Sequence, residues 1–221
     1  MEAKTWFEAF NKHMNPIFTK EDFETYKKGV LKDLKYYQKY LKQGAKILNL
    51  GCRLGCTAVP LSSLGYKIVG IDNDSRVVEA AQKNSKNFGK DTNILKGDIF
   101  KLTEYFEKDS FDVCVSGGLL EHFKKEDIKK LVKLQLELAP IVIASMPVKT
   151  ERTMNQYGFT EETALNHHTA DGIYRNFWSE NEWVNDVLKD FNIIEHFLET
   201  VNSAIGNFDE VFIVIKGAPS Y

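Results

Sequence analysis

Residues Ala45–Asp72 read AKILNLGCRLGCTAVPLSSLGYKIVGID, and this stretch decides the fold. A short apolar run, Ile47–Leu50, leads into a turn that begins and ends with glycine, Gly51–Gly55. A segment with a helical pattern follows, and a second apolar run, Ile68–Ile71, leads directly to Asp72. The pattern predicts a strand, a tight turn, a helix and a second, parallel strand that ends in an acid.

Such a unit is typical of sites for adenosine-containing cofactors, because the amides of the turn approach the ligand and the acid accepts hydrogen bonds from the ribose hydroxyls. The glycine spacing separates the cofactor classes. A dinucleotide fingerprint, G-x-G-x-x-G, would need glycines where the chain has Arg53 and Cys56. A G-x-G-x-G turn keeps two of its three glycines, Gly51 and Gly55. A nicotinamide- or flavin-dependent oxidoreductase is therefore the less favoured interpretation.

The segment Ile47–Gly55, ILNLGCRLG, resembles the first strand and turn of the class I S-adenosylmethionine (SAM)-dependent methyltransferases, which commonly read V-L-D-L-G-C-G-T-G. The resemblance covers about Tyr36 to Lys216 and leaves Pro147–Arg175 unmatched. It implies that the cofactor is SAM. It also implies cofactor contacts from Asn49, Gly51, Cys52, Arg53, Gly55, Asp72, Asn73, Asp98, Ile99 and Ser116.

The same resemblance implies the fold, a doubly wound α/β architecture with a seven-stranded, mostly parallel sheet. The expected strand order is 3-2-1-4-5-7-6, with strand 7 antiparallel. Apolar runs support this expectation, because Phe111–Ser116 and Ile141–Met146 fit the fourth and fifth strands. Two later runs, Ile193–Thr200 and Glu210–Ile215, fit an antiparallel hairpin that completes the sheet.

The expected domain organisation is a methyltransferase domain over residues 45–221, with an insert at about 147–175, preceded by a helical extension over residues 1–44. In the extension, Thr19 begins a helix-start pattern. Apolar side chains then recur at helical spacing: Phe23, Tyr26, Val30, Leu34, Tyr37 and Leu41. The stripe indicates a helix packed on the domain. It is also compatible with a lid over the site, in which Phe23 or Tyr26 would face the sulfonium of the cofactor.

Two residues depart from the family pattern. Asn49 stands where the family usually has an acid that helps hold the ammonium group of the cofactor, so the chain keeps an acceptor there but loses the charge. Arg53 stands at the centre of the turn in place of glycine, and the freedom of glycine at positive φ is lost. The departures are harmless, or they weaken SAM binding, or Arg53 contacts the acceptor or the methionine carboxylate. They motivate an alternative function, a SAM-fold protein that binds a ligand without transferring a methyl group.

His122 follows Glu121 after the fourth strand and is the candidate catalytic residue, as a base or as a contact of the acceptor. A histidine that bonds locally at a helix start is an equally good interpretation. His167 and His168 lie in the insert with Asp171, but no further ligand spacing supports a metal, so none is expected. A connection as long as the insert usually carries function, and we expect it to cover the substrate pocket.

Composition narrows the class of protein. A formal net charge of −2 and an isoelectric point near 6.2 give no electrostatic footprint for nucleic acid. The segment Ser116–Leu119 lacks the Asn/Asp-Pro-Pro-aromatic motif of amino-methyltransferases that modify bases. No apolar stretch approaches the ~18 residues of a membrane span. Cys52, Cys56 and Cys114 fit reduced thiols of a cytoplasmic protein. The sequence thus predicts a cytoplasmic SAM-dependent methyltransferase that acts on a small molecule.

Overall fold

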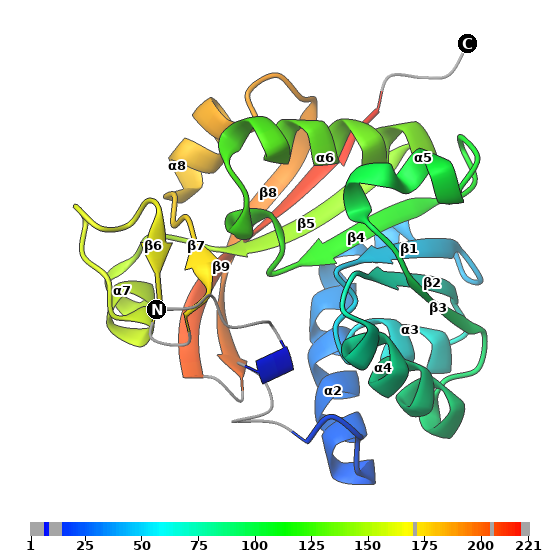
Figure 1. Cartoon of the computed structure of the whole chain (residues 1–221). Coiled ribbons are helices and arrows are strands. Elements are labelled where there is room, and N and C mark those ends of the chain that lie inside the picture. Colours follow the sequence, from blue (N-terminus) through cyan, green and yellow to red (C-terminus); the bar gives the residue numbers. More distant parts are fainter. Residues whose placement is uncertain (1–6, 9–14, 170–171, 204–205, 218–221) are drawn as a thin grey trace. The chain divides into compact units, whose positions relative to one another are not determined.

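The computed structural model of the chain describes residues 7–8, 15–169, 172–203 and 206–217 (Figure 1). Within these residues, seven strands form one sheet in the order β3-β2-β1-β4-β5-β9-β8, and β8 pairs with β9 antiparallel. Counted as strands 6 and 7, β8 and β9 give the order 3-2-1-4-5-7-6, so the predicted fold class and strand order are confirmed. The strands of this sheet are β1 (Lys46–Leu50), β2 (Lys67–Asp72), β3 (Thr92–Lys96), β4 (Val113–Gly117), β5 (Ile141–Pro147), β8 (Ile193–Ser203) and β9 (Gly206–Lys216).

The helices alternate with the strands along the chain, as the doubly wound pattern requires. They are α2 (Lys20–Tyr37), α3 (Ala58–Ser63), α4 (Ser75–Phe88), α5 (Leu102–Tyr105), α6 (Lys125–Leu138), α7 (Glu151–Tyr157) and α8 (Glu180–Glu182). Single turns also occur at η1 (Gln38–Tyr40), η2 (Ile99–Lys101), η3 (Leu120–His122) and η4 (Trp183–Val187). In the described part of the chain, no helix has both the length and the apolar character needed to cross a membrane.

The chain divides into two compact units. Of the described residues, the turn unit comprises 15–115 and 134–142, and the insert unit comprises 7–8, 116–133, 143–169, 172–203 and 206–217.

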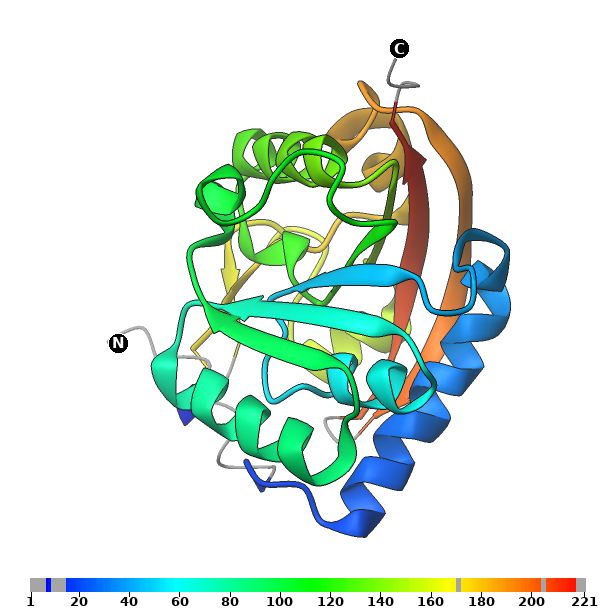
Figure 2. The ribbon, with the colours of Figure 1, turned by 90° about the vertical axis from the view of Figure 1, so that its right-hand side faces the viewer.

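In the turn unit, β1 pairs in parallel with β2, and β2 pairs in parallel with β3. Ile47, Leu48 and Leu50 are completely buried, which explains why β1 reads as an unbroken apolar run rather than an alternating one. Helices α3 and α4 pack on β2 and β3 (Figure 2). The predicted apolar face of α4 is confirmed, because Val77, Val78 and Ala81 are buried.

Helix α2 begins where the sequence predicts. Thr19 is its N-cap and forms a reciprocal capping box with Asp22. The predicted stripe supplies buried side chains at Phe23, Val30 and Leu34, and α2 packs against α3. The packing role of the stripe is therefore confirmed for these residues. Residues 1–6 and 9–14 of the expected extension lie outside the described residues.

In the insert unit, β8 and β9 are each longer than the apolar pattern predicts. Pairing continues beyond the predicted ends through Thr200↔Asp209 to Ser203↔Gly206. The sequence becomes polar there, but backbone hydrogen bonds between antiparallel strands do not require apolar side chains. Phe197 stacks on Phe212 across the pair, with ring centroids 5.1 Å apart. Figure 2 shows the two strands side by side along their length.

The insert at 147–175 is folded rather than an extended loop. It contains α7 and a short antiparallel hairpin of β6 (His167–His168) and β7 (Tyr174–Arg175). Phe159, Ala164 and Phe177 form a buried cluster against which Met154 and Tyr157 pack. The rings of Phe159 and Phe177 stack with centroids 4.0 Å apart. The aromatic residues of the insert thus build a small core of their own.

The segment after the insert begins with a capped α-helix and continues as a turn of π-helix. Ser179 and Glu182 form a reciprocal capping box. The regular α-helix behind it, α8, is only Glu180–Glu182 and passes into the π-helical turn η4. Trp183 and Val187 are buried, so the apolar pattern was correct while the type of helix was not.

Candidate functional site

The glycine-punctuated turn after β1 keeps a left-handed backbone at all three positions of the G-x-G-x-G pattern. The φ angles are 57° at Gly51, 48° at Arg53 and 85° at Gly55. The amide of Cys52 donates to the carbonyl of Ile71 over 3.1 Å, which ties the turn to β2. The carbonyl of Gly55 accepts from Val59, so the turn leads directly into α3. The main chain of the turn is therefore that of a glycine turn, although one glycine is replaced.

Arg53 adopts the conformation that the sequence argument reserved for glycine. The freedom of glycine is lost at this position, but Arg53 still adopts the left-handed conformation, with a φ of 48°. A side chain in this region costs about 1–2 kcal/mol for an L-residue. The Arg53 amide donates to Oδ2 of Asp72 over 3.0 Å, and this bond helps to hold the strained residue in place. The substitution changes the side chain of the turn and leaves its path intact.

Asp72, at the end of β2, is the acid that the sequence singles out. Its Oδ1 accepts from the amide of Asp74 at 3.3 Å, in addition to the bond from Arg53. Burial raises the pKa of Asp72, although hydrogen bonds from the amides of Asp74, Arg53 and Asn73 favour the ionised form. A carboxylate offers about four acceptor positions, so it retains capacity for a hydroxyl group of a ligand.

Asn49 is buried in β1, and its side-chain amide forms hydrogen bonds to the main chain. Its Nδ2 donates to the carbonyl oxygens of Leu50 and Val115, at 3.4 and 3.3 Å. Its Oδ1 is buried and has no hydrogen-bond partner among the described residues. A buried acceptor without a partner is uncommon in proteins. A donor group of a cofactor, such as an ammonium, would satisfy this atom, and in this respect the residues present fit SAM.

The segment after β3 lies next to Asp72. Lys96 pairs with Asp72 in the parallel register, and the Gly97 amide donates to the Asp72 carbonyl over 2.9 Å. Asp98 is exposed and caps the turn η2, because its Oδ1 accepts from the Phe100 amide over 2.9 Å. Ile99 begins that turn. The turn unit thus brings together, at one edge of β1–β3, the predicted cofactor residues Asn49, Gly51, Cys52, Arg53, Gly55, Asp72, Asn73, Asp98 and Ile99.

Cys52 lies within the turn, and Cys56 directly follows it. Burial raises the pKa of both side chains, as it does for Cys114 in β4. All three cysteines are free. The Tyr26 hydroxyl bonds to Cys56, and burial above all raises the pKa of Tyr26. These cysteines therefore act as small packing residues.

The aromatic residues of α2 pack on their own unit. The Phe23 ring stacks on Phe88 at 4.8 Å, and Tyr26 lies against Phe18 at 4.8 Å. Phe18 forms a buried cluster with Leu54 of the turn. These contacts explain the stripe as packing. The lid role of α2 stays a prediction.

Ser116 is the penultimate residue of β4 and belongs to the insert unit. It is buried, and its Oγ has no hydrogen-bond partner among the described residues. The chain then passes through Gly118, which has a φ of 60° and donates its amide to Ser145 of β5 over 2.9 Å. The positive φ turns the chain into η3, which carries Glu121 and His122.

Glu121 and His122 form a buried pair. His122 Nε2 lies 3.4 Å from Glu121 Oε1, and the two side chains are 8% and 3% exposed. His122 Nδ1 lies 2.7 Å from the carbonyl oxygen of Tyr174 in β7. A carbonyl oxygen only accepts, so this bond requires a proton on Nδ1. In the neutral ring Nε2 then carries the lone pair, and it faces the Glu121 carboxyl group.

Other parts of the insert are used for packing. His167 lies in β6, and burial lowers the pKa of its ring. Arg175 is buried, bonds to Thr169, and lies over the Tyr157 ring at 5.2 Å. Among the residues that the structure describes, no group of three or more His, Cys, Asp or Glu side chains could hold a metal ion. Asp171 lies outside the described residues.

Sequence reasoning missed the Tyr174 carbonyl, which bonds to the His122 ring, and Asn176, which bonds to the residues on either side of His122. Asn176 is buried and bonds to the main chain on both sides of His122. Glu121 could have been found from its position beside His122. No local signal marks Asn176, because its partners lie about fifty residues earlier in the chain.

Comparison with known proteins identifies the family. A family model described as "Methyltransferase domain" matches residues 47–138. This match covers less than half of the chain, and it shows that residues 47–138 are similar to methyltransferase domains. The predicted family, fold and cofactor class are thereby confirmed. Members of this methyltransferase family use SAM as the methyl donor.

Two curated relatives show what similar proteins do. The chain is 26% identical over 156 residues to the ribosomal protein L11 methyltransferase of Thermosipho africanus, covering 70% of this chain and 52% of the relative. It is 29% identical over 168 residues to the ubiquinone biosynthesis O-methyltransferase of Pelagibacter ubique, covering 71% of this chain and 64% of the relative. The chain thus spans about half to two thirds of the length of these relatives. Their acceptors differ, so they do not fix the acceptor of this chain.

Solved structures with the same fold cover more of the chain. A SAM-dependent methyltransferase from Methanosarcina mazei aligns with a TM-score of 0.69 at 18% identity, over 84% of this chain and 98% of that one. Magnesium protoporphyrin IX methyltransferase from Synechocystis with bound SAH aligns with a TM-score of 0.66 at 16% identity, over 97% and 96%. At these identities the likeness shows the fold alone.

Proposed function

We propose that this chain transfers a methyl group from SAM to a small-molecule acceptor that loses a proton from oxygen or nitrogen in the reaction. The observation that carries the proposal is the buried Glu121–His122 pair of a methyltransferase, with Nδ1 of His122 committed to a carbonyl oxygen. A catalytic base contributes to the reaction only where the acceptor atom loses a proton on methylation.

The cofactor residues of the proposal are those of the turn unit. Asp72 would bind the ribose hydroxyls, Asn49 Oδ1 would accept from the ammonium, and the amides of Gly51–Gly55 would approach the methionine part. Asp98, with Ile99, would contact the adenine. Ser116, whose Oγ is buried without a described partner, is the proposed contact in the insert unit. When bound, SAM supplies a methyl carbon attached to a sulfonium leaving group.

His122 is the proposed catalytic base. Its Nε2 would take the proton of the acceptor, and Glu121 would then stand next to the resulting imidazolium at hydrogen-bonding range. The Tyr174 carbonyl keeps the other nitrogen protonated, so the ring presents the basic nitrogen in one direction. This assignment requires no metal, and none is part of the proposal.

A small-molecule acceptor is favoured over a protein by the extent of the similarities. The match to the ribosomal protein L11 methyltransferases covers 36–52% of relatives such as those from Thermosipho africanus and Thermotoga maritima. Similarity to a small-molecule enzyme, the ubiquinone biosynthesis O-methyltransferase, extends over a larger share of that protein, 64%. The net charge of −2 also supports a partner other than nucleic acid. Three free, buried or half-buried cysteines support the proposed cytoplasmic location.

The alternative is a SAM-fold protein that binds a ligand without transfer, motivated by Asn49 and Arg53. Calorimetry with SAM, its demethylated product SAH and NAD tests the cofactor proposal. We expect binding of SAM and SAH and none of NAD. Binding of NAD alone would overturn it. A screen with SAM labelled in its methyl group, against phenols, carboxylic acids and amines, then separates the two functions. Transfer that His122→Gln abolishes supports the base, and SAM binding with no transfer to any acceptor class favours the alternative.

A further inference from the structure

We infer that Asn176 is a positioning residue for His122, and that the insert selects the protonated nitrogen of this histidine. The inference rests on the proposed role of His122 as a base. It assigns to the insert a task in the proton transfer itself, in addition to the predicted task of covering the substrate.

Asn176 holds the main chain on both sides of His122. Its amide donates to the Glu121 carbonyl over 2.7 Å, and its side-chain Nδ2 donates to the Phe123 carbonyl over 2.9 Å. These two carbonyls belong to the residues immediately before and after His122. Because both bonds come from one residue that is 3% exposed, the backbone of His122 cannot shift without breaking a buried hydrogen bond.

The Asn176 side chain is itself fixed inside the insert. Its Oδ1 accepts from the amide of Asn166 over 2.9 Å, and its Nδ2 lies 3.1 Å from the Tyr174 hydroxyl. The hydroxyl in turn donates to Oδ1 of Asn166 over 2.8 Å. The acceptor and donor atoms of the amide are therefore both matched, which also settles which atom is oxygen and which is nitrogen.

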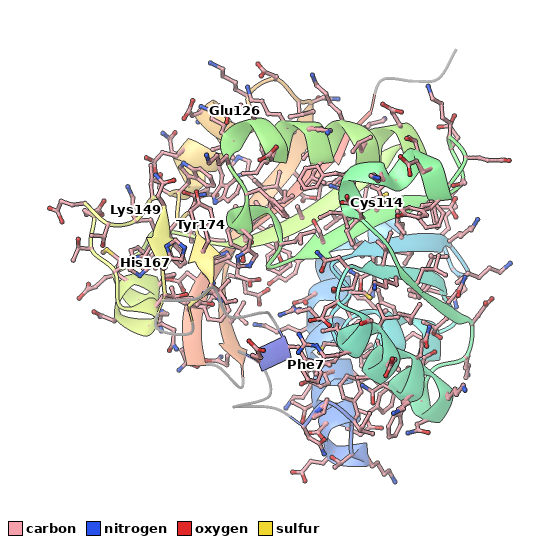
Figure 3. All side chains as sticks on the ribbon, in the orientation of Figure 1. Phe7, Cys114, Glu126, Lys149, His167 and Tyr174 are labelled. Atoms are coloured by element: carbon pink, nitrogen blue, oxygen red, sulfur yellow. The ribbon has the colours of Figure 1, made fainter. Side chains whose placement is uncertain are left out.

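The imidazole is held by the same stretch of chain. Tyr174, two residues before Asn176, accepts from Nδ1 of His122 through its main-chain carbonyl at 2.7 Å. Figure 3 labels Tyr174 and His167, which lie on the two strands of the short hairpin, and in this hairpin Tyr174 pairs with His168. The segment Tyr174–Asn176 fixes the backbone around His122 with one residue and the ring with another, and so defines both the place and the tautomer of the ring.

The consequence is chemical. With Nδ1 carrying a proton, Nε2 is the nitrogen that can take the proton of an acceptor O–H or N–H, and Glu121 lies 3.4 Å from it. The opposite tautomer would place the N–H toward Glu121 and leave the basic nitrogen against a carbonyl oxygen, where it can neither accept nor donate. The insert thus decides whether His122 can act as a base.

The test uses nuclear magnetic resonance of the histidine ring nitrogens in the full chain labelled with 15N-histidine, without added acceptor. The chain has five histidines, and His122 is assigned as the signal lost in His122→Gln. At pH ~9, above the ordinary titration range of histidine, we expect Nδ1 of His122 in the unsubstituted protein to carry a proton. A Nδ1 without a proton would overturn the inference, and this measurement needs no substitution of the insert.

The second arm is Asn176→Asp, which replaces the donor to Phe123 by a carboxylate oxygen and keeps an acceptor for Asn166. We expect the Nδ1–H form of His122 to fall by roughly half as the ring is released. The matched control is Asn155→Asp, the same change on the exposed face of α7 in the same insert, which should leave the His122 signals unchanged. A folded Asn176→Asp protein with unaltered His122 signals contradicts the inference.

Calorimetry with SAH on the same proteins separates this inference from the proposed function. Intact SAH binding with altered His122 signals is the expected result for Asn176→Asp. If the unsubstituted chain does not bind SAH, the proposed function is overturned. The tautomer of His122, which is measured without ligand, would still stand.

Discussion

The turn after β1 and the segment around His122 are held in place by different kinds of hydrogen bonds. In the turn, the left-handed backbone at Gly51, Arg53 and Gly55 persists although one glycine is replaced, and it is fixed by main-chain hydrogen bonds together with the bond from the Arg53 amide to the Asp72 carboxylate. Around His122, side chain and main chain of Asn176 and the carbonyl of Tyr174 hold the site from a distant part of the sequence. The comparison teaches that a site built from main-chain geometry tolerates side-chain substitution, whereas a site built from long-range contacts depends on individual residues.

The largest expected effect concerns the core that supports the insert. Phe177 is completely buried and stacks on Phe159, so Phe177→Ala should lower the free energy of unfolding by about 3–5 kcal/mol. Chemical denaturation measures it. The control is Leu165→Ala in the same insert, where the side chain is 47% exposed, and its effect should stay below ~1 kcal/mol. Equal effects would mean that the insert is a loosely attached loop, and the contrast with the turn would disappear.

Asp72→Asn should move affinity and stability in opposite directions. Loss of charge-assisted bonds worth ~1.5–3 kcal/mol weakens SAM binding roughly ten- to a hundredfold. The pKa of Asp72 is raised in the folded protein, so the folded state keeps the proton to higher pH than the unfolded chain, whose aspartate titrates near ~3.9. Stability therefore falls as pH rises from the unfolded pKa through the folded one, and the neutral amide removes this loss at pH 7.

Calorimetry and thermal unfolding at pH 7 check the two effects of Asp72→Asn. Asp91→Asn, the same substitution at an exposed position of the turn unit, should change neither. An unchanged SAM affinity in the Asp72 variant would remove Asp72 from the proposed cofactor site.

Asn49→Asp tests whether the missing family acid can simply be restored. The amide donates to two buried carbonyls, so a carboxylate would leave both without a donor and would bury a charge. We expect a loss of about 1–3 kcal/mol of stability and no gain in SAM affinity. Asn93→Asp on the exposed side of β3 is the matched control. Tighter SAM binding by a protein of unchanged stability would show that the acid is merely absent.

The smallest expected effect isolates the backbone strain at Arg53. Arg53→Gly and Arg53→Ala both remove the side chain, but only glycine relieves the φ of 48°. The glycine variant should be more stable than the alanine variant by about 1 kcal/mol. Thermal unfolding of the pair gives the difference directly. Equal stabilities would mean that the turn relaxes around any residue, and that its geometry is not fixed by the main chain.

The family resemblance implied the strand order, and the helix-start pattern was enough to predict the beginning of α2 at Thr19. A helix cap depends on near neighbours in the chain. The ends of β8 and β9 were predicted too short, because pairing between strands continues where side-chain alternation stops. The packed core of the insert was not predicted. Its members, such as Phe159 and Phe177, are recognised as core residues only from their contacts with one another in the folded chain.

The sequence by itself predicted the methyltransferase resemblance and the sheet, and it led to the proposal of a cofactor site at Gly51, Gly55 and Asp72, because these residues depend on local backbone geometry and on their place at strand ends. Only the tertiary structure decided that Arg53 keeps the left-handed conformation of the turn and that the Asn49 amide donates to two carbonyl oxygens. It also decided that Tyr174 bonds to the His122 ring and that Asn176 bonds to the residues beside it. The physical reason is the range of the interactions. A φ angle or a cap is set within a few residues, whereas a hydrogen bond between residues 123 and 176 exists only after the chain has folded.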